Sequence, residues 1–186
     1  MSSRIKIKHL TKRYNRDVFR DFSIDIGSGI NLLKGPNGSG KSTLIKCVLG
    51  LIKYKGEITV NGKIGYIPEN YILPDYVTVE SFIKNIASLT ASEYRDFLID
   101  FKLESKKDEY ILNLSKGMKQ KLIIIQALIH KPDIIICDEP INGLDACLQE
   151  EFIERLDILK SNGKTVIVAT HYDRLYKDIV TREINL

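Results

Sequence analysis

Apolar residues follow two different patterns in the segments expected to be strands. Near the N-terminus they alternate with polar residues, which is typical of strands that bury one face, at Ile5 and Ile7 and then at Phe22, Ile24 and Ile26. The polar stretch from Thr11 to Asp21 is expected to connect these two strands. Continuous apolar runs further along predict strands buried on both faces of a parallel sheet, at Ile30 to Leu33, Ile134 to Cys137 and Val166 to Ala169.

Helical spacing of apolar residues occurs between these strands. Ser42 to Leu49 predicts a helix that Gly50 ends, and Thr78 to Phe101 predicts a helical insert with Ser92 as a cap. Two later helices are expected from Ser115 to about Ile129 and near Leu148 to Leu159. Because buried strands alternate with helices, the predicted fold class is α/β.

The pair Asn61-Gly62 separates two strand-like segments, Glu57 to Val60 and Lys63 to Ile67. Asn-Gly favours a two-residue hairpin turn, because both central positions of that turn have a positive φ. The sequence therefore predicts a hairpin here, as part of a small antiparallel sheet.

A glycine-rich segment lies between a predicted strand and a predicted helix and fits the pattern G-x-x-x-x-G-K-[ST]: Gly35-Pro36-Asn37-Gly38-Ser39-Gly40-Lys41-Ser42, followed by Thr43. The glycines allow backbone N–H groups to surround an anion, and the helix that follows adds its positive end. Lys41 is expected to neutralise the β- and γ-phosphates, and Ser42 to hold Mg²⁺. The segment predicts binding of a nucleoside triphosphate with Mg²⁺, with hydrolysis.

Two acidic residues end the predicted strand at Ile134 to Cys137, in the sequence Asp138-Glu139-Pro140. Ligands of parallel α/β sheets bind at the carboxyl ends of the strands. We expect Asp138 to hold the metal ion through a water molecule, and Glu139 to polarise the attacking water. By itself, an Asp-Glu-Pro after a strand is more often a turn, so the interpretation depends on the glycine loop.

Composition narrows the class of protein. The 186 residues are 44% apolar, enough for one core, and no apolar run approaches the roughly 20 residues that span a bilayer. The three cysteines lack metal-ligand spacing, and the net charge of +4 is spread along the chain, so direct binding of nucleic acid is not expected. The N-terminus differs from a secretory signal, which predicts a cytoplasmic protein.

The segment Leu114-Ser115-Lys116-Gly117-Met118 precedes the Asp138 strand by one helix and resembles the signature of ABC ATPases. The order of motifs along the chain is also similar to that family: Tyr14, the glycine loop, Glu69, the signature, Asp138-Glu139, Gly143-Leu144-Asp145 and His171. The resemblance implies a single domain over 1–186 with a P-loop NTPase core. Residues 1–69 and 115–186 would form the ATP-binding core with its β subdomain, and 70–114 a helical subdomain.

The resemblance also implies a role for each matching residue. Tyr14 would stack on adenine, Glu69 would bind the metal ion, and His171 would reach the γ-phosphate. Ser115 and Gly117 would dock the γ-phosphate of ATP held by a second ATPase subunit in a head-to-tail dimer, most simply a homodimer. Considered one at a time, these residues fit plainer roles better: a surface tyrosine, a structural histidine and a capped helix start.

Three residues depart from the family pattern. Glu69 stands where a glutamine is usual and adds negative charge near Glu139, while Lys116 replaces a glycine and Met118 a glutamine. The expected function is nevertheless that of the energising subunit of an ABC transporter, held at the inner face of the membrane by a separate transmembrane permease. The alternative is an ABC-type ATPase that acts on nucleic acid or the ribosome, and a P-loop kinase has less support.

Overall fold

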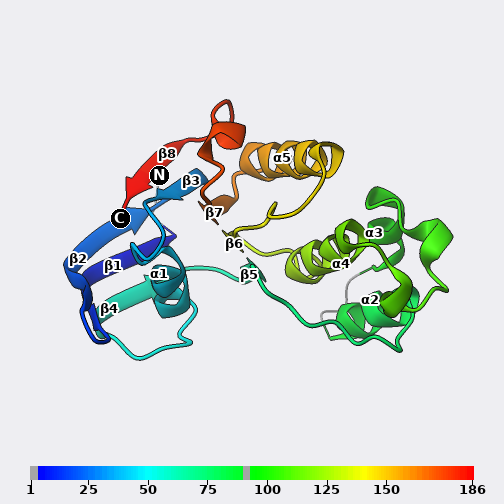
Figure 1. Ribbon diagram of the computed structural model, residues 1–186, viewed down its shortest axis with the longest axis horizontal. Helices are drawn as coiled ribbons and strands as arrows, with labels where there is room; N and C mark the ends of the chain where they lie inside the picture. Colours follow the sequence, from blue (N-terminus) through cyan, green and yellow to red (C-terminus); the bar gives the residue numbers. More distant parts are fainter. Residues whose placement is uncertain (1–3, 90–92) are drawn as a thin grey trace.

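The computed structural model describes residues 4–89 and 93–186 and is built around two sheets (Figure 1). Five parallel strands form the larger sheet in the order β5-β6-β7-β3-β8, and three antiparallel strands form the smaller one in the order β2-β1-β4. The strands are β1 (Ile5–Arg13), β2 (Asp17–Ile26), β3 (Gly29–Lys34), β4 (Lys55–Val60), β5 (Ile64–Ile67), β6 (Ile134–Asp138), β7 (Thr165–Ala169) and β8 (Arg182–Asn185). The expected α/β class, with a parallel sheet and a small antiparallel sheet, is confirmed.

Helices cover both faces of the parallel sheet (Figure 1). The α-helices are α1 (Lys41–Val48), α2 (Val79–Ser88), α3 (Arg95–Asp100), α4 (Lys116–Leu128) and α5 (Ala146–Ser161). Short 3-10 segments span Glu104–Lys106, Ile111–Asn113 and Asp173–Tyr176. The expected cap Ser92 lies outside the described residues.

The central strands bury side chains on alternate faces, which explains why they read as continuous apolar runs. In β6, Ile135 and Cys137 pack with residues of α4 and α5, whereas Ile134 and Ile136 pack with α1 and the antiparallel sheet. Because every side chain of such a strand meets a covered face, no polar position interrupts the run. This arrangement brings the ends of β3, β6 and β7 to one edge of the sheet.

The stretch Thr11 to Asp21 was expected to be a connection, and this was wrong: β1 and β2 extend through most of it, with a turn only at 14–16. The two strands pair with several register shifts. His9 and Asp21 have φ of +54° and +55°, and their side chains meet at 2.6 Å. These bulges break the alternation of apolar and polar residues, so the pattern conceals the strands.

The hairpin predicted at Asn61-Gly62 is also wrong. β4 pairs antiparallel with β1, whereas β5 pairs parallel with β6, so the two residues connect different sheets. The Asn61 amide donates to the Arg4 carbonyl, and the Lys63 amide to Asp133 Oδ2. Each strand therefore finds its partner elsewhere in the chain, and only Gly62 has a positive φ, +126°. Tertiary pairing overrides the local turn preference.

The segment between β5 and α4 is helical and packs on α4. Thr78 caps α2 by accepting a hydrogen bond from the Ser81 amide, and the apolar residues of α2 and α3 join the same buried cluster as those of α4. The end of α3 also reaches α5, because the Arg155 guanidinium lies 3.9 Å from the Phe101 ring centroid. Figure 1 shows α2 and α3 at the opposite end of the molecule from the antiparallel sheet.

Candidate nucleotide-binding site

The glycine loop connects the end of β3 to the start of α1 and packs against β2. A Cβ on Gly40 would lie 2.8 Å from Val18 Cγ1 and 2.9 Å from Phe19 Cζ, and Gly40 has a φ of +111°. Only glycine fits both the space and the conformation at this position. The loop is therefore held directly against β2, in a fixed position relative to the antiparallel sheet.

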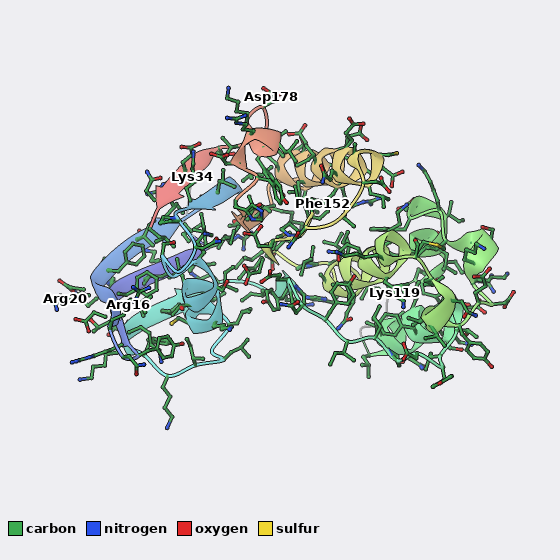
Figure 2. The ribbon with its side chains drawn as sticks, in the orientation of Figure 1. Arg16, Arg20, Lys34, Lys119, Phe152 and Asp178 are labelled. Atoms are coloured by element: carbon green, nitrogen blue, oxygen red, sulfur yellow. The ribbon has the colours of Figure 1, made fainter. Side chains whose placement is uncertain are left out.

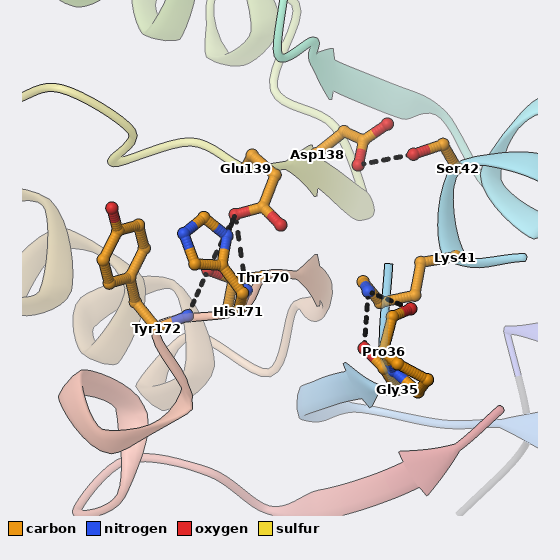
Figure 3. Close-up of polar contacts among 9 residues, drawn as sticks. All are labelled: Gly35, Pro36, Lys41, Ser42, Asp138, Glu139, Thr170, His171 and Tyr172. Atoms are coloured by element: carbon orange, nitrogen blue, oxygen red, sulfur yellow. Dashed lines mark hydrogen bonds and ion pairs between the residues drawn. The ribbon is translucent and has the colours of Figure 1, made fainter. Parts of the chain in front are cut away.

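The start of α1 supplies unsatisfied amide groups and a buried cation. Gly40 is the N-cap residue and provides no side-chain cap for the first amides of α1. The Nζ atom of Lys41, which is almost fully buried, donates to the Gly35 carbonyl at 2.7 Å and to the Pro36 carbonyl at 3.3 Å (Figure 3). An anion at the helix start would meet both the amides and this ammonium group.

The end of β6 lies beside the start of α1. Ser42 Oγ donates a hydrogen bond to Asp138 Oδ1 at 3.2 Å, and Asp138 is buried (Figure 3). Burial raises the pKa of the Asp138 carboxyl, and the charges of Glu69 and Glu139 raise it further, whereas the Ser42 hydrogen bond lowers it. The hydroxyl and the carboxylate thus present oxygen atoms side by side at the foot of the loop.

Glu139 is fixed by β7 and the residues that follow it. Its amide donates to the Ala169 carbonyl at 2.8 Å, and its backbone has a φ of +46°, which is unusual for a residue other than glycine. Its Oε2 atom accepts from Thr170 Oγ1 at 3.0 Å and from the His171 amide at 3.4 Å, and lies 3.0 Å from His171 Nδ1. Figure 3 shows the other carboxylate oxygen directed toward Lys41 and Ser42.

These elements line an open cavity of about 820 Å³. The expected site residues that line it are Tyr14, Asn37, Gly38, Gly40, Lys41, Ser42, Thr43, Glu69, Glu139 and His171. Gly35, Pro36 and Ser39 belong to the same loop, and Asp138 is joined to it through Ser42. The structure thus brings together the residues from the N-terminal and C-terminal parts of the chain that were expected to act together.

A comparison with known protein families decides the family. A family model described as ABC transporter matches residues 19–142, which contain the glycine loop and the Asp138-Glu139 pair. The chain belongs to the family of ABC transporter ATP-binding proteins. Members of this family bind and hydrolyse ATP, and the protein is an ATP-binding and hydrolysing subunit of the ABC transporter type.

Individual relatives agree with this assignment. An uncharacterised ABC transporter ATP-binding protein of Methanocaldococcus jannaschii is 37% identical over 181 residues, which is 92% of this chain and 69% of the relative. The zinc import ATP-binding protein ZnuC of Rickettsia conorii is 32% identical over 176 residues, 90% of this chain and 76% of the relative. A solved ATP-binding subunit of an ABC transporter superposes with a TM-score of 0.87 at 28% identity, covering 98% of this chain and 85% of that one.

The ABC signature lies apart from the cavity. Ser115 caps α4 by accepting a hydrogen bond from the Met118 amide at 3.3 Å, and Gly117 packs against Leu148 so closely that a Cβ would overlap that side chain. Neither Ser115 nor Gly117 is among the residues that line the cavity. Within one chain, the structure does not bring these two residues to the glycine loop.

The departures from the ABC pattern have distinct surroundings. Glu69 lines the cavity with Glu139, and its charge adds to burial and to Asp138 in raising the pKa of Tyr66 to about 12. Lys116 lies across Gly143, where its Nζ occupies the space that a Cβ would take. The extra carboxylate is therefore part of the site, whereas the lysine fills a gap beside the loop that follows Glu139.

Several residues of the site were missed by the sequence reasoning. Asn15, Arg16, Val18 and Asn142 line the cavity, and Thr170 holds Glu139. Thr170 directly follows the buried strand β7, so the rule that ligands gather at strand ends was a signal for it. Arg16 had no such signal, because it lies in a turn of a stretch that appeared to be a plain connection.

Proposed function

We propose that the protein hydrolyses ATP with Mg²⁺ in this cavity, as one half of an ATP-dependent dimer that drives a separate transmembrane permease. The observation that carries the proposal is the convergence of the Lys41 ammonium, the Ser42–Asp138 pair and the Glu139 carboxylate on one cavity. The following paragraphs assign each group a task.

The oxygen groups at the foot of the loop fit a hard cation. Ser42 and Asp138 would hold Mg²⁺, with Glu69 as a third ligand, and the ion would neutralise charge on the phosphates. Among residues 4–89 and 93–186 no cluster of three or more His, Cys, Asp or Glu could hold a metal by itself. Phosphate and water would complete the shell, which is the usual arrangement for Mg²⁺.

The base and the phosphates would occupy opposite parts of the cavity. Lys12 Nζ lies 4.6 Å from the centroid of the Tyr14 ring and occupies one face, so adenine would stack on the other. The loop Gly35 to Thr43 would surround the phosphates with amide groups, and Lys41 would leave the Gly35 carbonyl to bind the β- and γ-phosphates. These contacts orient the terminal phosphate toward β6 and β7.

Glu139 is the proposed general base. The polar contacts of its side chain with described residues all fall on Oε2, so Oε1 is available to take the proton of the attacking water. Thr170 and His171 hold the carboxylate in place, and His171, 3.0 Å from Glu139 Oε2, would orient the water and the γ-phosphate. Glu139 thus polarises the nucleophile while the loop fixes the phosphate.

A second copy of the chain would complete the site. Ser115 and Gly117 stand at the start of α4 and away from the cavity of their own chain, which supports a head-to-tail homodimer in which they reach the γ-phosphate held by the partner. In this arrangement residues 70–114 act as a helical subdomain that ends where the signature begins.

The permease would be reached through the segment from Tyr71 to Tyr76. Ile72 is 99% exposed and Tyr76 is 81% exposed, an unusual display of large apolar side chains for a surface loop. No helix in the described part of the chain is long and apolar enough to cross a membrane. The permease would therefore hold the protein at the inner face of the membrane, and recovery only with nucleic acid or ribosomes would contradict this proposal.

The variant Glu139→Gln tests the proposed chemistry. Turnover should fall by 10²-fold or more because the amide cannot accept the proton, while ATP binding by calorimetry should stay within a few-fold of the parent. Because ATP then persists, the variant should elute as a dimer with ATP and Mg²⁺ and as a monomer with EDTA. Full turnover by Glu139→Gln would remove Glu139 from the proposed role.

A further inference from the structure

The turn between β1 and β2 places three arginines close together, and only one of them is without an acidic partner. Arg13 Nε lies 3.7 Å from Asp17 Oδ1, and Arg20 Nη2 lies 2.6 Å from Asp17 Oδ2. Arg16 makes no ion pair or side-chain hydrogen bond with any residue in the described ranges. Arg16 is exposed, so its guanidinium keeps its capacity to bind an anion.

Arg16 also lies where an anion is expected. It lines the same cavity as Lys41, and a Cβ on Gly38 would lie 3.4 Å from Arg16 Nη2. The guanidinium is therefore next to the backbone of the glycine loop, on the side open to the cavity. Figure 2 shows Arg16 over the antiparallel sheet and Arg20 at its outer margin.

The fold fixes the position of the β1–β2 turn beside the glycine loop. The Tyr14 amide donates to the Arg16 carbonyl at 3.0 Å, and Arg13 pairs with Asp17 across the turn, so the turn is short and closed. At the other side, Val18 and Phe19 contact Gly40 so closely that no side chain fits there. The turn that carries Tyr14 and Arg16 is thus held at a set distance from the loop.

We infer that Arg16 binds the α- and β-phosphates of the nucleotide from the side opposite Lys41, an assignment that rests on the proposed nucleotide site. The amides of such a loop surround the α- and β-phosphates, and Gly38 lies in the middle of the loop. A guanidinium beside Gly38 meets these oxygens with parallel N–H groups, a strong and directional contact. Tyr14 and Arg16 then hold the base and the phosphate chain from one three-residue turn.

The inference predicts how affinity depends on the phosphates. Because ATP and ADP both carry α- and β-phosphates, loss of Arg16 should weaken both to the same extent. The contact is made equally before and during the reaction, so KM should rise while kcat stays the same. Since the interaction is exposed and charge-assisted, the loss should be smaller at high salt.

Calorimetric titration of ATP and ADP into Arg16→Met tests the inference, with Arg20→Met as the matched control and Glu139→Gln as the background for ATP. We expect Kd to rise about tenfold for both nucleotides in Arg16→Met, equal to about 1.4 kcal/mol. The Kd of Arg16→Lys should lie between those of the parent and Arg16→Met. The Kd of Arg20→Met should stay within twofold of the parent, because Asp17 already neutralises that arginine.

Three results would overturn the assignment: an unchanged Kd in Arg16→Met, an equal loss in Arg20→Met, which would reveal a general charge effect, or a loss for ATP alone, which would place Arg16 at the γ-phosphate. If the parent binds no ATP, the proposed function itself fails. If the parent binds ATP and Arg16→Met binds it equally well, only the role of Arg16 fails.

Discussion

Replacing Thr170 by valine removes one hydroxyl and keeps the shape of the side chain. Thr170 is 2% exposed, and its Oγ1 donates to Glu139 Oε2 at 3.0 Å and accepts from the Tyr172 amide at 3.1 Å. In Thr170→Val both hydrogen bonds are lost and a methyl group faces the carboxylate. The substitution therefore tests whether this hydroxyl holds Glu139 in place.

The magnitude follows from the two lost bonds. A hydrogen bond to a charged group contributes roughly 1.5–3 kcal/mol, and Glu139 has little access to water that could replace the hydroxyl, because its side chain is 12% exposed. The Tyr172 amide loses a hydrogen bond to a neutral hydroxyl, which is a smaller contribution. A loss of about 2 kcal/mol should lower Tm by roughly 4–8 °C for a chain of this size. With Glu139 less well oriented, kcat should fall about tenfold.

Thermal unfolding and steady-state ATPase assays of the parent, Thr170→Val and Thr170→Ser measure both effects. Thr170→Ser keeps the hydroxyl and should recover most of the Tm and kcat. In a Glu139→Ala background the valine substitution should cost less stability, because the partner is already gone. Parent-like Tm and kcat in Thr170→Val, or equal losses in both backgrounds, would refute the idea that the hydroxyl acts through Glu139.

Two further predictions concern the other carboxylates of the cavity. Glu69→Gln should leave ATPase activity within an order of magnitude of the parent, because the amide oxygen can still bind Mg²⁺; complete loss of turnover would show that the carboxylate is required. Asp138→Asn should raise Tm of the protein in EDTA without nucleotide at neutral pH. Burial raises the pKa of Asp138 in the folded protein above its usual value of 3.8. The parent therefore loses stability as the pH rises from the pKa of the unfolded chain to that of the folded protein, because the buried carboxyl must then ionise. The gain in Tm should therefore disappear below about pH 3.8, and an equal gain at every pH would contradict this account.

The sequence alone determined those features that depend on neighbouring residues. The glycine loop, the start of α4 at Ser115 and the buried strands β6 and β7 were all predictable, because loop glycines, helix caps and runs of apolar residues are set by local conformation and by burial of a whole segment. The resemblance to ABC ATPases added Tyr14 and His171, which no local pattern would have selected.

Only the tertiary structure decided which segments meet. Asn61-Gly62 has the local preference of a hairpin, yet β4 and β5 join different sheets, because β4 pairs with β1 and β5 pairs with β6. The same holds for the site: Thr170 beside Glu139, and Arg16 beside Gly38, are contacts between residues far apart in the chain. Distant contacts of this kind depend on strand order and register, which a local pattern does not encode.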